Sequence, residues 1–480
     1  MASITKRATI LIFCRVLNNA VMLLSPVFLT RLFNVQAYGQ YQEFIVYGML
    51  ISGLIEFTIN TNLIYFIPKH PDRERQGATH TALLIFAASC LGIVVVYVLR
   101  GLILAKTSYN FTAPLLAFIF FYLNCDFFES YLLGKKRTDY VLYYSTGRVV
   151  VRTAALIASA WLSRDVMTVI WTLVAVEIVK CLFVLTALRN VFTKRLDRGL
   201  FREQLRYIVP LGSSVVISQV NSQLANLFVS IKMGVERLAV YANGNRQIPI
   251  MDIIRRSVMD VLFPEMTQIG EAERLQLWRR ANVVFCALVF PVYAVFFCYA
   301  HAFIETLFTA KYLAAVPLFR IYLTLMVIQC FDMGTPLRAI NQNKYYIFGS
   351  ILDLSVNVGM LVVLLRPLGF VTPAVSFILG ETVMAVYLGS RILHFYRISL
   401  SQLFLWRKII TVIWCAVVAL PALLVGIWID LNPVVRAVSF STLYLVAYYV
   451  AIRRFKIAEV ELLAEKLSNR LRDVRARIGQ

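Results

Sequence analysis

Apolar stretches of about 20 residues recur along almost the whole chain, and each is long enough to cross a bilayer as a helix. The chain is 60% hydrophobic and only 15% charged, so a soluble protein of 480 residues could not bury its apolar surface. Because a bilayer offers no partners for backbone N–H and C=O groups, runs of this length form helices there. We therefore predict an all-α polytopic membrane protein with about fourteen transmembrane helices, at residues 8–30, 42–67, 78–99, 112–133, 141–162, 166–188, 207–231, 240–264, 282–304, 314–337, 345–365, 371–392, 409–429 and 433–452.

The positive charge predicts the topology. A formal net charge of +22 would suggest a nucleic-acid partner in a soluble protein. Here Lys and Arg are concentrated in the connecting segments on the side that the N-terminus shares, as in cytoplasmic loops. We therefore expect both termini in the cytoplasm, no nucleic-acid partner, and a first apolar run that is a retained helix rather than a signal peptide.

A basic segment without an apolar run, residues 191–206, separates the first six predicted helices from the next six. A weak repeat supports this division, because the pattern of Phe28–Tyr41 recurs 200 residues later in Phe228–Tyr241. Six helices per half give both halves one orientation, and transporters built in this way bind substrate between the halves. The expected organisation is a parallel pseudo-repeat around a central cavity: an N-terminal six-helix lobe (1–190), a basic cytoplasmic linker (191–206), a C-terminal six-helix lobe (207–396), two additional transmembrane helices (397–452) and a cytoplasmic amphipathic basic helix (453–480).

The predicted eighth helix, within Val240–Met266, carries a charged face. At 100° per residue, Arg246, Arg256 and Asp260 fall on one side of the helix and apolar residues on the other. An intramembrane charge costs about 2.5–3.5 kcal/mol or more, so it normally faces a partner or a wet cavity. We interpret this helix as one wall of a cationic, water-filled cavity.

Arginines in other spans extend this interpretation. Arg148 and Arg152 share one face of the fifth span, with no acidic residue between them, and an anion would explain their pairing. Guanidinium groups match phosphate oxygens bidentately. The predicted pyrophosphate-binding residues are Arg15, Arg148, Arg152, Arg246, Arg256 and Arg320, although Arg320 could instead extend to the outer interface.

Neutral polar residues form stripes in the first and seventh spans. Such stripes contact sugar hydroxyls in a transporter of glycans, and they equally serve helix–helix hydrogen bonding. The predicted glycan-facing residues are Asn18, Asn19, Ser214, Ser218, Asn221 and Ser222.

Acidic residues within spans fall into two groups. Glu177 lies three residues from Lys180, a spacing that predicts an ion pair within the membrane. Glu56, Asp126 and Glu129 have no basic neighbour within one helical turn, and they are the candidates for a coupling H⁺ or Na⁺ site.

Other classes of function lack their motifs. The sequence contains no GxxxxGK[ST] motif, its four His are scattered, and its eight Cys show no paired spacing, so we expect neither a metal site nor a resident cofactor. The predicted outer loops are too short for an extramembrane catalytic domain. We therefore expect a protein that is not an enzyme.

Four degenerate motifs, in order along residues 10–395, resemble the Wzx-type oligosaccharide flippases of the MOP superfamily, which also holds lipid II flippases and MATE exporters. The motifs are Pro26–Leu32 with Tyr38–Tyr41, Tyr241–Asn243 with Val261–Pro264, Leu307–Phe308 with Lys311–Tyr312 and Pro317–Arg320, and Pro367–Gly369 with Ala374. The resemblance implies two six-helix lobes around a cationic cavity.

The same resemblance implies a cargo, a polyprenyl-pyrophosphate-linked oligosaccharide repeat unit. It would move from the inner to the outer leaflet of a bacterial cytoplasmic membrane by alternating access, for a surface polysaccharide such as lipopolysaccharide or exopolysaccharide. Membrane lipids, a polysaccharide polymerase and chain-length proteins are the implied partners. Many relatives have twelve helices, so the expected fourteen leave a lipid II flippase or a MATE-like ion-coupled exporter open. The excess of arginine argues against a cation exporter.

Overall fold

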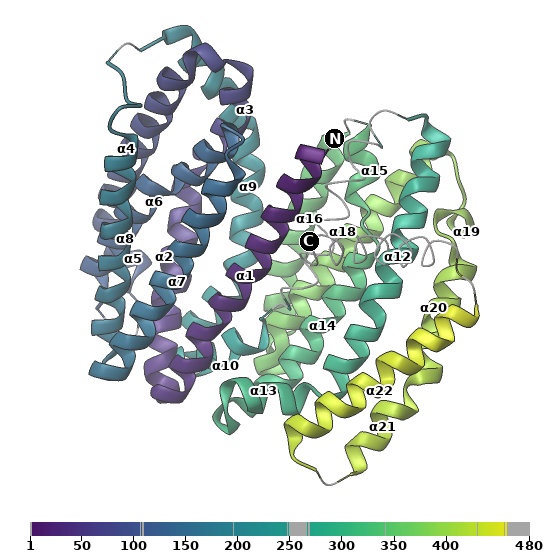
Figure 1. The fold of residues 1–480 in the computed structure, drawn as a ribbon. Helices are drawn as coiled ribbons and strands as arrows, with labels where there is room; N and C mark the ends of the chain where they lie inside the picture. Colours follow the sequence, from purple (N-terminus) through teal and green to yellow (C-terminus); the bar gives the residue numbers. More distant parts are fainter. Residues whose placement is uncertain are drawn as a thin grey trace, which may run out of the picture. The chain divides into compact units, whose positions relative to one another are not determined.

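The computed structural model describes residues 2–105, 107, 110–194, 196–246, 248, 266, 269–340, 342–429, 431–455 and 457, without the side chains of residues 2–13, 15, 210 and 214. These residues form α-helices and short 3-10 helices, with no strand among them. They divide into two compact units, Met1–Asn243 and Gly244–Gln480 (Figure 1). The predicted all-α class is confirmed.

The first unit packs long helices side by side, with α1 against α7, α6 against α4 and α8, and α9 against α2. Its elements are α1 Ala2–Leu32, α2 Val35–Glu56, α3 Asn62–Lys69, η1 Pro71–Arg73, α4 Glu74–Val98, α5 Arg100–Ile103, α6 Thr112–Gly134, α7 Thr138–Ser163, α8 Val166–Leu188, α9 Arg198–Met233 and α10 Val235–Gly244.

The second unit is built in the same manner, with α16 against α18, α12 against α14 and α20, and α21 against α22. Its elements are α12 Glu271–Cys298, α13 Ala300–Phe308, η2 Ala310–Ala315, α14 Val316–Cys330, α15 Gly334–Ala339, α16 Asn343–Val363, α17 Leu365–Leu368, η3 Gly369–Val371, α18 Thr372–Tyr396, α19 Leu400–Leu403, α20 Trp406–Ala419, α21 Pro421–Trp428 and α22 Pro433–Arg454.

Nine helices in the described part of the chain are long and apolar enough to cross a membrane, and Val16–Leu32 is a shorter apolar helix. The helices α2, α7 and α9 have the length for a span but carry more polar residues. Most of the eighth predicted span, and the tail from residue 458, lie outside the described residues.

The second predicted span, 42–67, is wrong in its bounds. The helix α2 begins at Val35, where Asn34 accepts a hydrogen bond from the Ala37 N–H, and it ends at Glu56. Phe57 and Thr58 then take left-handed conformations, with φ of 45° and 61°. Non-glycine residues rarely adopt this conformation, and it cannot continue a right-handed helix, so the apolar run is split between α2 and α3.

The boundary between the compact units lies after α10, whereas the sequence places a linker at residues 191–206. Residues 189–197 connect α8 to α9, whereas residues 198–206, which the sequence assigns to the linker, form the first turns of α9. However, α9 packs on α2, α3 and α4, which belong to the first predicted lobe. Compactness and the pseudo-repeat thus divide the chain differently, and the repeat remains a prediction.

Candidate functional site

Ion pairs lie inside the first unit, where α6, α7 and α8 pack together. The Nη1 atom of Arg148 is 3.1 Å from Asp126 Oδ1, and its Nη2 atom is 3.2 Å from Glu129 Oε2. All three side chains are largely buried, with 25–32% of their area exposed. Because Asp126 and Glu129 are three residues apart on one face of α6, one guanidinium from α7 bridges both carboxylates.

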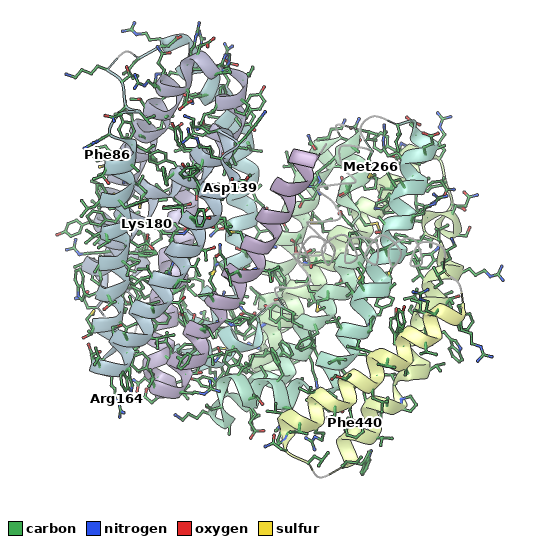
Figure 2. The ribbon with its side chains drawn as sticks, viewed as in Figure 1. Phe86, Asp139, Arg164, Lys180, Met266 and Phe440 are labelled. Carbon is green, nitrogen blue, oxygen red and sulfur yellow. The ribbon has the colours of Figure 1, made fainter. Side chains whose placement is uncertain are left out.

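A second pair of contacts joins α7 to α8. Arg152 Nη1 lies 3.8 Å from Glu177 Oε1, and Lys180 Nζ lies 2.5 Å from Glu177 Oε2. Glu177 and Lys180 are nearly inaccessible, and Lys180, labelled in Figure 2, also stands 4.9 Å from the ring centroid of Tyr122. The ion pair predicted from the spacing of Glu177 and Lys180 is therefore confirmed. We call the six charged side chains the charge network: Asp126, Glu129, Arg148, Arg152, Glu177 and Lys180.

The sequence shows no acidic residue between Arg148 and Arg152, but the structure gives both arginines acidic partners. Their partners lie on neighbouring helices, 19–25 positions away in the sequence, so no local spacing reveals them. Asp126 and Glu129 likewise have no basic neighbour within one helical turn of the sequence, but in the structure both contact Arg148. A buried cation with two carboxylates costs far less than the isolated one that the sequence suggested.

Glu56 at the end of α2 adds a further carboxylate beside the charge network. It interacts electrostatically with Asp126, and both act on the phenol of Tyr122. With Glu56 included, the described residues of this region hold four carboxylates against three basic groups. One negative charge is therefore in excess when all of them are ionised.

The other predicted arginines are distributed over the chain. Arg246 and Arg320 belong to the second unit, where Arg246 stands 5.9 Å from the ring centroid of Phe308. Arg320 donates from Nε to the Phe297 carbonyl at 3.2 Å and lies over the same residue's ring. Arg256 and the side chain of Arg15 lie outside what the structure describes.

The neutral polar residues have different surroundings. Asn18 donates to Ser145 Oγ at 3.2 Å and so links α1 to α7, while Asn19 is half-buried. Ser218 and Ser222 are exposed, one turn apart on α9, and Asn221 between them is buried. Since Ser214 has no described side chain, the exposed part of this stripe on α9 is the Ser218–Ser222 face.

A buried polar interface between α2 and α9–α10 was missed by sequence reasoning. Ser230 donates to Glu43 at 2.6 Å, Tyr38 donates to Asn243 at 3.1 Å, and Gln42 donates to the Tyr38 oxygen at 2.6 Å. The repeat between Phe28–Tyr41 and Phe228–Tyr241 marks these helix ends as equivalent in sequence. However, it does not indicate which residues are in contact, so the interface could not be predicted from it.

Metal-binding geometry is absent from the described residues, which contain no group of three or more His, Cys, Asp or Glu side chains positioned around one point. All eight cysteines are free thiols.

Comparison with known proteins identifies relatives of the chain. A model of the family described as polysaccharide biosynthesis protein matches residues 28–317. A search of curated protein sequences finds no match.

Solved structures with the same fold are transporters. The lipid II flippase MurJ, in an inward closed conformation, is 10% identical and has a TM-score of 0.69, with 95% of this chain and 100% of that chain covered. An inward-facing multidrug resistance MATE transporter of the MOP superfamily is 16% identical, with a TM-score of 0.55 and coverage of 79% and 94%. A MOP superfamily transporter from Pyrococcus furiosus is 14% identical, with a TM-score of 0.52 and coverage of 82% and 97%. At these identities the likeness establishes the fold.

Proposed function

The chain belongs to the polysaccharide biosynthesis protein family, in the MOP superfamily, and from this premise we propose that it flips polyprenyl-pyrophosphate-linked oligosaccharide repeat units from the inner to the outer leaflet of the cytoplasmic membrane. The observation that carries the proposal is the combination of a polysaccharide family match with a flippase fold over nearly the whole chain. The first indicates the class of cargo and the second the kind of movement.

In this proposal the charge network exchanges partners during transport. Arg148 is held by Asp126 and Glu129 in the described state, 3.1 and 3.2 Å away. A pyrophosphate offers the same guanidinium more acceptor oxygens in bidentate geometry. Proton or Na⁺ binding to the carboxylates weakens their hold on Arg148, and the arginine is then available to the cargo. Arg15, Arg152, Arg246, Arg256 and Arg320 complete the proposed set of pyrophosphate ligands.

The excess carboxylate suits the coupling ion. Glu56, Asp126 and Glu129 are the proposed ion-coupling residues, and one monovalent cation would balance the four-to-three charge count of Glu56 and the charge network. The glycan would meet neutral donors and acceptors, for which the exposed Ser218 and Ser222 are suited. Asn18, Asn19, Ser214 and Asn221 remain proposed members of this glycan-facing set.

The proposed setting is a bacterial cytoplasmic membrane with both chain ends in the cytoplasm. A polysaccharide polymerase and chain-length proteins are the proposed partners, in a surface polysaccharide pathway. A second candidate function is lipid II transport, favoured by the coverage of the lipid II flippase fold. A MATE-like exporter is less favoured, because the family match indicates a role in polysaccharide biosynthesis.

The test is transport in proteoliposomes that contain only this protein. We expect a fluorescent polyprenyl-pyrophosphate oligosaccharide to become accessible to an impermeant reagent in the opposite leaflet, faster than in protein-free vesicles. Lipid II, assayed in parallel in the same kind of vesicle, should cross the bilayer more slowly than this oligosaccharide. Faster movement of lipid II, or movement of neither, would contradict the proposal.

A matched pair of variants tests the headgroup ligand. Arg148→Gln should weaken cargo binding by about ten- to a hundredfold, because a hydrogen bond to a charged group contributes roughly 1.5–3 kcal/mol. Arg164→Gln is the control, since Arg164 follows the same helix as its C-terminal cap and has an exposed side chain (Figure 2). Equal effects of the two variants would remove Arg148 from the site.

A further inference from the structure

A large apolar groove lies in the second unit, between α14–α15, α18 and α19–α20. Its volume is about 510 Å³, within the range of roughly 300–1,000 Å³ for sites that hold small molecules. One wall is a continuous stripe on α18, from Thr382 to Leu393, and the other walls include Phe331, Phe404 and Trp406. Almost no polar surface lines the groove, so its occupant must be a hydrocarbon.

Small residues create the space. Ala385 and Gly389 lie one turn apart on α18 and form part of the groove wall, while Val386 beside them is 67% exposed. The groove is therefore open to its surroundings along α18. From Thr382 to Leu393 the helix rises about 16 Å, at 1.5 Å per residue. This length matches half of a hydrocarbon core of about 30 Å, the depth of one leaflet.

Basic residues stand at one end of the groove. Arg397 caps the C-terminus of α18 one turn beyond Leu393, and Arg407 follows Trp406 in the first turn of α20. Both side chains are exposed, and neither has an acidic side chain within ion-pair distance in the described part of the chain. Between them, α19 is fixed because Arg279 of α12 donates to the Leu403 and Gln402 carbonyls.

The charge pattern places this basic end on the cytoplasmic side, where the inner leaflet presents its headgroups. We propose that the groove binds an anionic phospholipid of the inner leaflet, with one acyl chain along α18 and the phosphate held by Arg397 and Arg407. The apolar walls, the one-leaflet length and the cationic rim at the interface each fit this ligand. The site is independent of the cargo and of the charge network.

Trp406 provides a reporter, because its indole lines the groove. The protein is reconstituted with phosphatidylglycerol or phosphatidylcholine carrying brominated acyl chains, which quench tryptophan fluorescence on contact. The Trp406 signal is the difference between wild-type protein and Trp406→Phe, since the chain contains six tryptophans. We expect brominated phosphatidylglycerol to quench this signal at a lower mole fraction than brominated phosphatidylcholine.

Two kinds of variant distinguish the contribution of the lipid headgroup from that of the acyl chain. Arg397→Gln and Arg407→Gln should each raise the mole fraction of phosphatidylglycerol needed for half-quenching by about fivefold, leaving phosphatidylcholine unchanged. Arg202→Gln, at an exposed position of α9, is the control for a lost positive charge. Ala385→Phe should remove quenching by filling the groove. Ala87→Phe on α4, between exposed Leu83 and Leu91, controls for the added ring.

Three outcomes would overturn the proposal. Equal quenching by both lipids would mean ordinary contact with bulk lipid. Quenching by neither would mean that something else covers the groove. Relief of quenching by low concentrations of added polyprenyl phosphate would mean that the groove serves the cargo chain. If Ala385→Phe lowers the thermal stability of the purified protein, the proposal is judged on the two arginine variants alone.

Discussion

Half-buried arginines of the two units have different kinds of partner. In the first unit, Arg148 and Arg152 pair with carboxylates on neighbouring helices. In the second unit, Arg274, Arg279 and Arg320 donate to backbone carbonyls, at 2.7, 3.3 and 3.2 Å. At an exposed site of that unit, His301 Nδ1 lies 3.6 Å from Glu305 Oε2, a contact that is an ion pair when the imidazole is protonated.

This difference indicates which unit can change its ion pairs when an ion binds. A carboxylate changes its charge when it binds H⁺, or its partner when it binds Na⁺, whereas a backbone carbonyl cannot be titrated. Arginine is always protonated, so the response must come from its acceptor. The first unit therefore has the means to couple an ion to a rearrangement of its arginines, whereas the carbonyl acceptors of Arg274, Arg279 and Arg320 do not respond to an ion in this way.

The largest expected effect comes from leaving carboxylates without their cation. Arg148→Gln should destabilise the protein by about 3–5 kcal/mol, because Asp126 and Glu129 remain buried and uncompensated. The triple variant Arg148→Gln, Asp126→Asn, Glu129→Gln is neutral and should recover most of this stability. Thermal unfolding of purified protein measures both.

The triple variant also distinguishes structure from function. If Arg148 binds cargo and the two carboxylates couple the ion, transport stays lost although stability returns. Recovery of transport together with stability would show that the three residues serve only the fold, and the contrast between the units would lose its functional meaning.

A smaller effect concerns the ion itself. Glu56→Gln removes the excess negative charge beside Asp126, so an imposed ion gradient should no longer accelerate transport. Coupling energies of about 1–3 kcal/mol correspond to losses of about 5- to 150-fold. Glu305→Gln in the second unit is the control. Unchanged gradient dependence in Glu56→Gln would move the coupling site elsewhere.

The sequence was informative where the information is local. Long apolar runs predict helices, and the spacing of Glu177 and Lys180 predicts their contact, because both depend on neighbours along one helix. The end of α2 was missed because the backbone conformations of Phe57 and Thr58 leave no mark in hydropathy. The partners of Arg148 were missed because helix pairing brings together residues 19 and 22 positions apart.

A modest effect is expected from an arginine of the second unit. Arg320→Gln loses its hydrogen bond to the Phe297 carbonyl, an interaction of about 0.5–1.5 kcal/mol. Thermal unfolding should show this small loss, and the gradient dependence of transport should not change. A large change in gradient dependence would break the distinction between the two units.

The smallest effect concerns Asp197, a half-buried carboxylate that caps the start of α9 outside the membrane-spanning segments. The backbone N–H groups of Leu200 and Gly199, with Arg73, hold the pKa of Asp197 below its ordinary value. A carboxyl whose folded pKa is depressed contributes stability above its unfolded pKa and loses it as the pH falls through the folded pKa. We therefore expect wild-type protein to lose thermal stability relative to Asp197→Asn as the pH falls below about 5. Asn also caps helices, so the variant keeps an acceptor for these N–H groups but no titrating charge. A constant difference in thermal stability across this range would mean that Asp197 contributes only as a helix cap.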